Sequence, residues 1–80
     1  MITTSLPRVD EWVERYYTPL FRFAARLCGS PEMALGLTLR TFRLALERSR
    51  ELPVPRNVRA WLFTILFNQF LELRPHFRRA

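Results

Sequence analysis

The chain has 80 residues, of which 49% are hydrophobic and 14% are aromatic, and its formal net charge is +6. This length predicts one domain with a thin core, and the apolar content argues against intrinsic disorder. No apolar run approaches the roughly 18 residues that cross a bilayer, and no basic segment followed by an apolar one marks the N-terminus for export. We therefore expect a soluble, cytoplasmic protein that forms a single domain over residues 1–80.

The positive charge is distributed unevenly along the chain. Residues 1–52 contain eight arginines and six acidic residues, whereas residues 53–80 contain five arginines and Glu72 alone. The absence of lysine is also typical of a GC-rich genome, so the distribution is more informative than the arginine count. Clustered positive charge attracts phosphates through counterion release, without selecting a sequence. The C-terminal part therefore favours polyanions or acidic proteins as partners.

Prolines and acidic residues mark two helix starts in the first third of the chain. Pro7 precedes Asp10 and Glu11, and carboxylates in a first turn favour the positive end of the helix dipole. Thr18–Pro19 combines a capping residue with a first-turn proline, which indicates a second start. We expect the second helix to end near Cys28.

Two further helices are predicted on either side of a proline-containing loop. The third spans Pro31 to about Arg50, with no internal breaker stronger than Gly36. The stretch ELPVPRN, residues 51–57, contains two prolines and is typical of an ordered connection. The fourth helix spans about Arg56 to Arg74, and Pro75 should stop it. With no strand alternation and no repeat, the sequence predicts an all-α fold, a small bundle of three to four helices ordered from about residue 7 to 75.

The third predicted helix carries two apolar stripes when its residues are placed at 100° intervals. The first stripe comprises Ala34, Leu37, Leu44 and Ala45. The second stripe comprises Leu35, Leu39, Phe42 and Leu46. One helix of a small bundle rarely buries two stripes completely. The second stripe therefore either packs against the first two helices or forms part of a docking surface for another protein, bordered by Arg40 and Arg43.

The fourth predicted helix divides into three sides. Its core seam comprises Val58, Leu62, Ile65, Leu66 and Leu73. An adjacent aromatic row comprises Arg59, Phe63, Phe67, Phe70 and Arg74, and Asn68 lies on a third side. Unpaired bases stack on aromatic rings for about 1 to 3 kcal/mol each while arginine holds phosphates, so the row suits single-stranded nucleic acid. The alternatives are that Phe63 and Phe70 complete the core and that Phe67 forms a contact in an oligomer or crystal interface.

The segment YTPLFRFAARLCGSPEMA resembles the start of region 2 in bacterial sigma-70-type transcription initiation factors, where the pattern Y-x-x-L-x-R-F-A-x-R-x-x-G-D-x-x-x-A is common. The matching positions are Tyr17, Leu20, Arg22, Phe23, Ala24, Arg26, Gly29 and Ala34. Further matches to the polymerase-binding and promoter helices of the family are Thr41, Phe42, Ala45, Trp61, Leu62, Ile65 and Asn68. The resemblance covers about residues 10–75 and is closest to the extracytoplasmic-function group.

In that family, the third helix binds the clamp helices of the largest polymerase subunit. The fourth helix and its preceding loop capture unpaired non-template bases of the −10 promoter element. The resemblance therefore implies a DNA-binding role for one set of residues. This set is Arg56, Asn57, Arg59, Phe63, Phe67, Asn68 and Arg74. Phe63 and Phe67 would stack on bases, and Asn68 would hydrogen-bond; we expect no second DNA-binding domain within the 80 residues.

The third predicted helix departs from the family pattern. Where the family usually reads A-E-D-L-V-Q-E-T-F, this chain reads A-L-G-L-T-L-R-T-F. Arginine in place of a carboxylate reverses the local charge, and opposed like charges at an interface cost several kcal/mol. The predicted polymerase- or partner-binding residues are Leu35, Gly36, Leu39, Arg40 and Arg43.

Two functions follow from these patterns. In the first, the chain is a sigma region 2-like domain that binds core RNA polymerase and single-stranded −10 promoter DNA. In the second, it is a sigma-like interaction module that no longer binds polymerase and instead binds an anti-sigma or other protein, or a second copy of itself.

Catalysis is not expected from the residue inventory. The chain has one His, one Asp and one Cys, widely separated, which cannot assemble a nucleophile–base pair or a metal cluster. The lone Cys28 excludes an internal disulfide and should be a packing residue. We predict no enzymatic activity, no cofactor or metal, no small-molecule substrate and no membrane partner.

Overall fold

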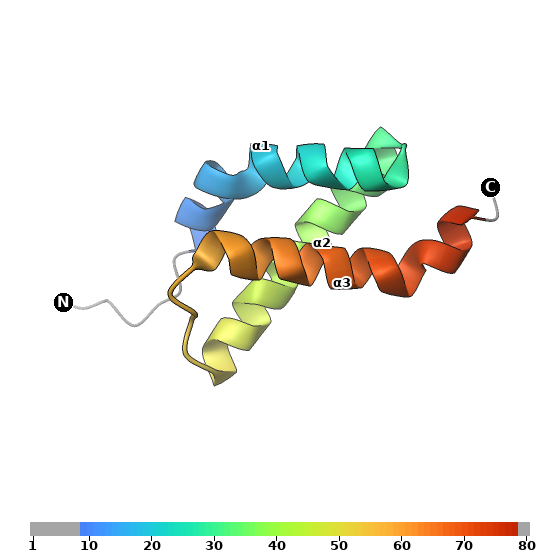
Figure 1. Ribbon diagram of the computed structural model, residues 1–80. Coiled ribbons are helices and arrows are strands. Elements are labelled where there is room, and N and C mark those ends of the chain that lie inside the picture. Colours follow the sequence, from blue (N-terminus) through green and yellow to red (C-terminus); the bar gives the residue numbers. More distant parts are fainter. Residues whose placement is uncertain (1–8, 79–80) are drawn as a thin grey trace.

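The computed structural model describes residues 9–78, and the side chains of residues 9–74. This part of the chain forms three helices, α1 (Val9–Cys28), α2 (Pro31–Glu51) and α3 (Val58–Arg78), and contains no strand. Each helix packs against both of the others. Figure 1 shows α1 and α3 running in the same direction, with α2 crossing both obliquely. The predicted all-α fold of three to four helices is confirmed, with three helices.

The predicted helix start at Thr18–Pro19 is wrong, because α1 continues through Pro19. An internal proline removes one backbone hydrogen bond and tends to bend a helix. Trp12, Leu20 and Ala24 nevertheless form one buried stripe that extends across the proline. A break at Pro19 would separate Trp12 from the rest of this stripe, so burial outweighs the lost bond. The predicted start at Pro7 lies outside the described residues.

The connection between α1 and α2 follows the local signals of the sequence. Gly29 adopts a left-handed conformation with φ of 71°, and its N–H donates to the Ala25 carbonyl at 2.8 Å. Glycine adopts this conformation without steric cost. Ser30 then caps α2, because its Oγ accepts a hydrogen bond from the Met33 N–H at 3.3 Å.

The loop of residues 52–57 leads into α3, which begins at Val58 instead of about Arg56. Asn57 caps the helix: its Oδ1 accepts a hydrogen bond from the Ala60 N–H at 3.0 Å. The predicted stop at Pro75 is wrong, since the backbone stays helical to Arg78. One proline removes a single helical hydrogen bond and bends the helix, which need not end there. Figure 1 shows the last turns of α3, in red, leaving the line of the helix.

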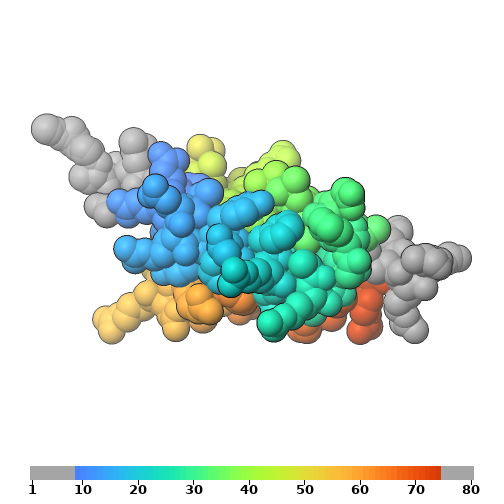
Figure 2. Space-filling model, turned by 90° about the horizontal axis from the view of Figure 1, so that it is seen from above, coloured from blue at the N-terminus to red at the C-terminus, as the bar shows by residue number. Residues whose placement is uncertain are grey.

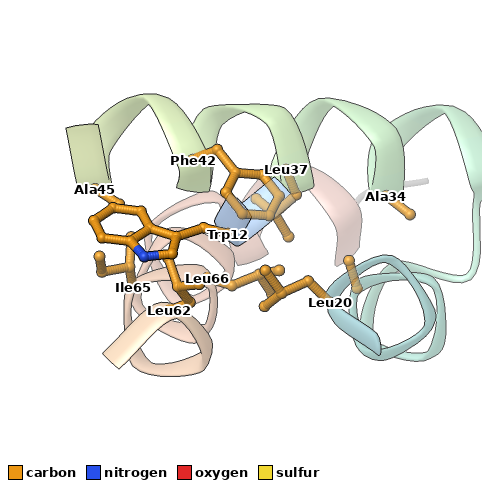
Figure 3. Close-up of a cluster of buried hydrophobic side chains, with 10 residues drawn as sticks. Trp12, Leu20, Ala34, Leu37, Phe42, Ala45, Leu62, Ile65 and Leu66 are labelled. Atoms are coloured by element: carbon orange, nitrogen blue, oxygen red, sulfur yellow. The ribbon is translucent and has the colours of Figure 1, made fainter. Parts of the chain in front are cut away.

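All three helices contribute to one core, as Figure 3 shows. The buried hydrophobic side chains are Trp12, Leu20, Ala24, Ala34, Leu37, Phe42, Ala45, Leu62, Ile65 and Leu66. The Trp12 ring meets the Trp61 ring edge to face, with centroids 5.6 Å apart. Most of the predicted core seam of α3 is thus buried, while Val58 and Leu73 pack at its edge.

The second apolar stripe of α2 divides between core and surface. Phe42 is buried and Leu46 is half-buried, whereas the exposed fractions of Leu35 and Leu39 are 43% and 54%. Thr38 and Thr41 take core positions, Thr38 between the two stripes and Thr41 within the first, and their hydroxyls donate to helix carbonyls one turn earlier, at 2.7 and 2.9 Å. The packing alternative therefore holds for Phe42 and in part for Leu46, and the docking alternative stays a prediction for the exposed Leu35 and Leu39.

Candidate nucleic-acid interface

The aromatic row of α3 is completed by a residue from α1. The ring of Phe23 lies 5.3 Å from that of Phe63 and 6.4 Å from that of Phe67, centroid to centroid. Phe67 and Phe70 stack at 6.3 Å. The four rings therefore form one cluster across two helices. Phe23 is absent from the predicted site, because no helical periodicity within α3 can reveal a neighbour on α1.

The four rings differ in how much surface they offer to a ligand. Phe23, Phe63 and Phe70 are half-buried and pack against the core, so the core-completing alternative is supported for Phe63 and Phe70. Phe67 remains 40% exposed. The Arg59 guanidinium carbon lies 4.8 Å from the centroid of Phe63, so Phe63 is in contact with Arg59 as well as with Phe23. Phe67 is therefore the ring most accessible to an incoming base.

A shallow basic cleft, open to solvent, lies where the first half of α1 meets the start of α3. It has a volume of about 490 Å³, and the described residues that line it are Arg15, Tyr16, Arg56, Asn57, Val58 and Arg59. Figure 2 shows the starts of α1, in blue, and of α3, in orange, at the same end of the molecule. Three of the predicted DNA-binding residues, Arg56, Asn57 and Arg59, line this cleft. Arg15 and Tyr16 were missed, since some 40 residues separate them from the rest of the cleft.

The described lining of this cleft is basic, with three guanidiniums and no carboxylate. The first turns of α1 and α2 contain acidic residues, whereas the first turn of α3 has none. The positive end of the α3 dipole therefore adds to the three arginines, and backbone N–H groups with guanidiniums are favourable ligands for a phosphate.

The remaining predicted DNA-binding residues have different surroundings. Asn57 is occupied by its capping hydrogen bond, which leaves only its amide NH₂ for a ligand. Asn68 is exposed about 100° around the helix from Phe67, so it lies outside the aromatic row. Arg74 is exposed one turn beyond Phe70. The structure therefore joins cleft and row through Arg59, which contacts Phe63 and lines the cleft.

A second depression lies on the outward face of α2. Its volume is about 500 Å³, and it is lined by Gly36, Leu39, Arg40, Arg43, Leu44 and Glu47. Arg43 pairs with Glu47, with Nε and Oε2 3.6 Å apart. Four of the five predicted partner-binding residues line this depression, and the fifth, Leu35, is exposed on the same helix.

No group of three or more His, Cys, Asp or Glu residues is placed to hold a metal ion in the described part of the chain. Burial raises the pKa of the Cys28 thiol, which favours the less nucleophilic protonated form at neutral pH. Within residues 9–78, no helix is both long and apolar enough to cross a membrane. His76 lies outside the residues whose side chains are described.

No family model matches the sequence, and neither a curated protein nor a solved structure matches it. The features of the chain that bear on function are therefore the contacts and charges of the cleft, the aromatic row and the α2 depression.

Proposed function

We propose that this chain is a sigma region 2-like domain that acts in transcription initiation in the bacterial cytoplasm. It would bind single-stranded DNA of the −10 promoter element together with core RNA polymerase, and it would perform no covalent chemistry. The observation that carries the proposal is the position of Arg59. It is one of the three arginines that line the cleft, and its guanidinium contacts Phe63 of the aromatic row.

The two parts of this surface supply the two kinds of contact that single-strand binding needs, contacts to phosphates and stacking on bases. Arg15, Arg56 and Arg59 would hold backbone phosphates in the cleft, which contributes affinity without sequence selection. Phe67 would stack on an unpaired base, for about 1 to 3 kcal/mol. Because base stacking on a side chain requires the base to leave the duplex, this surface favours melted DNA over double-stranded DNA.

The test measures binding of a fluorescein-labelled −10-type oligonucleotide by anisotropy, single-stranded and as the matching duplex. Arg59→Ala and Arg15→Ala should weaken single-strand binding and flatten its salt dependence, because each removes a phosphate contact. Phe67→Ala should weaken it by about 1 to 3 kcal/mol with the salt dependence unchanged. Arg48→Ala and Leu35→Ala change an exposed arginine and an exposed apolar residue of α2, outside the surface, and serve as controls. Equal binding by all five proteins would refute the proposal.

The second candidate function is a sigma-like interaction module that binds an anti-sigma or other protein, or itself. The observation that favours it is the α2 depression, where Leu39 is 54% exposed and Arg40 stands where the family carries an acid. Co-purification with core polymerase separates the two functions. Retention on polymerase that is lost on Leu39→Glu supports the first, and a monomer that binds neither polymerase nor single-stranded DNA excludes it.

A further inference from the structure

Gly36 has no explanation within the chain itself. It lies inside a helix of 21 residues, where glycine is less favourable than alanine. Among the described glycines only Gly29 has a positive φ, so the backbone does not require glycine at position 36. A Cβ added to Gly36 would meet nothing within 4 Å, so internal packing does not require it either. The remaining physical use of glycine is to let another backbone approach closely.

The surroundings of Gly36 are open and partly apolar. Leu39 and Leu44 line the same depression, and Leu35 is exposed one position before the glycine. The outward face of α2 is about 30 Å long at 1.5 Å per residue, which allows contact over several turns of another helix. An exposed glycine beside exposed leucines, with charged side chains next to them, fits the crossing point of a second helix laid against α2.

The charges on this face identify the chemistry of the occupant. Glu47 is paired with Arg43, whereas Arg40 forms no ion pair with the described residues. One guanidinium beside exposed leucines is therefore uncompensated, and it favours a carboxylate on the partner. A nucleic acid fits less well, because its phosphates would meet Glu47 and two leucine side chains in the depression.

We infer that the outward face of α2 docks one α-helix of another protein, whose apolar stripe is flanked by Asp or Glu and which crosses α2 at Gly36. The inference rests on the protein-binding part of the proposed function and is independent of its DNA-binding part. Acidic residues on this helix would select a partner with basic residues, whereas Arg40 selects one with acidic residues.

The test uses two synthetic amphipathic helices of about 20 residues with the same leucine stripe, flanked in one by Glu and in the other by Lys. Fluorescence anisotropy should show the Glu peptide binding the full chain about tenfold more tightly than the Lys peptide. Arg40→Glu should reverse this preference. Arg48→Glu, an identical charge change on α2 outside the depression, is the matched control and should preserve it.

Gly36→Leu separates binding from folding. Because nothing lies within 4 Å of the added Cβ, the melting temperature should stay the same or rise, while the Glu peptide should bind about tenfold more weakly. Equal affinity for the two peptides, or affinity unchanged by both Gly36→Leu and Arg40→Glu, would overturn the inference.

Two other occupants give different results in the same proteins. If sedimentation shows concentration-dependent dimers that Gly36→Leu abolishes, the occupant of the α2 face is a second copy of the chain. If Arg40→Glu abolishes binding of single-stranded DNA, the occupant is a nucleic acid. Either result contradicts the inference. Unchanged DNA binding in both variants is expected, so failure of the peptide experiment and failure of the DNA proposal are distinguishable.

Discussion

Arg59 illustrates how one side chain can serve two parts of a surface. Its guanidinium lies 4.8 Å from the Phe63 centroid, and a cation–π contact at an exposed site contributes about 0.5 to 1 kcal/mol. The contact also restricts the arginine in the free protein, so less rotamer freedom is lost when a phosphate binds. Arg59 should therefore matter more to binding than Arg56, which has no such ring contact among the described residues.

Gln69 is the one described buried residue with an unsatisfied side-chain atom: it is 7% exposed, and its Oε1 accepts no hydrogen bond. Leaving a buried acceptor without a donor costs about 1 to 3 kcal/mol. We expect Gln69→Leu to raise the free energy of unfolding by about 1 kcal/mol, measured by urea denaturation. Asn68→Leu, on the exposed neighbouring position, should change it by less than about 0.5 kcal/mol. Destabilisation by Gln69→Leu would indicate that the amide has a partner in solution.

At the scale of the element, the start of α3 depends on the Asn57 cap. Asn57→Ala removes the acceptor for the Ala60 N–H and should lower the free energy of unfolding by about 1 kcal/mol. Asn68→Ala is the matched control, because that residue is exposed inside the same helix and alanine is the better helix former.

Asn57→Asp separates capping from DNA binding. Aspartate caps as well as asparagine does, so thermal stability should be retained. The added carboxylate faces a cleft lined by three arginines and should weaken binding of single-stranded DNA, most strongly at low salt. Equal losses of stability in Asn57→Ala and Asn57→Asp would contradict the capping role of the Asn57 side chain.

In the middle of α1, tertiary packing overrides a local sequence signal. Thr18–Pro19 has the composition of a helix start, yet the helix is continuous there. Trp12 and Leu20 lie on the same side of α1 and are both buried against the other helices. The stripe is therefore fixed by what α2 and α3 present to it, which no local pattern contains.

For the whole molecule, three helices share one small core, so single truncations should have large effects. Leu20 is fully buried, and Leu20→Ala should lower the free energy of unfolding by about 2 to 5 kcal/mol. Domains of ordinary stability have about 5 to 15 kcal/mol in total, so a large share of it would be lost. Urea denaturation of Leu20→Ala against Leu35→Ala measures this, since Leu35 is 43% exposed and its truncation should cost less than about 0.5 kcal/mol. Similar losses from both would contradict the assigned core.

The whole molecule also places its two proposed binding surfaces on different elements. The cleft is formed by α1 and the start of α3, whereas the depression lies on the outward face of α2. A domain arranged in this way can hold DNA and a protein partner without direct competition between them.

The sequence by itself determined the all-α class, the ends of the α1–α2 connection and the core seam of α3. These features depend on caps, glycine and prolines within one turn, or on the 3.6-residue period of one helix. It also located four of the six residues that line the α2 depression, because residues three and four apart share a helix face.

Only the tertiary structure decided the continuity of α1 through Pro19, the division of the second α2 stripe, and the addition of Phe23, Arg15 and Tyr16 to the α3 surface. The reason is the same in each case. Burial and proximity depend on which other helix covers a given face, and that partner is separated from it in the chain by a loop or a whole helix. A pattern within one helix carries no information about the neighbour that packs against it.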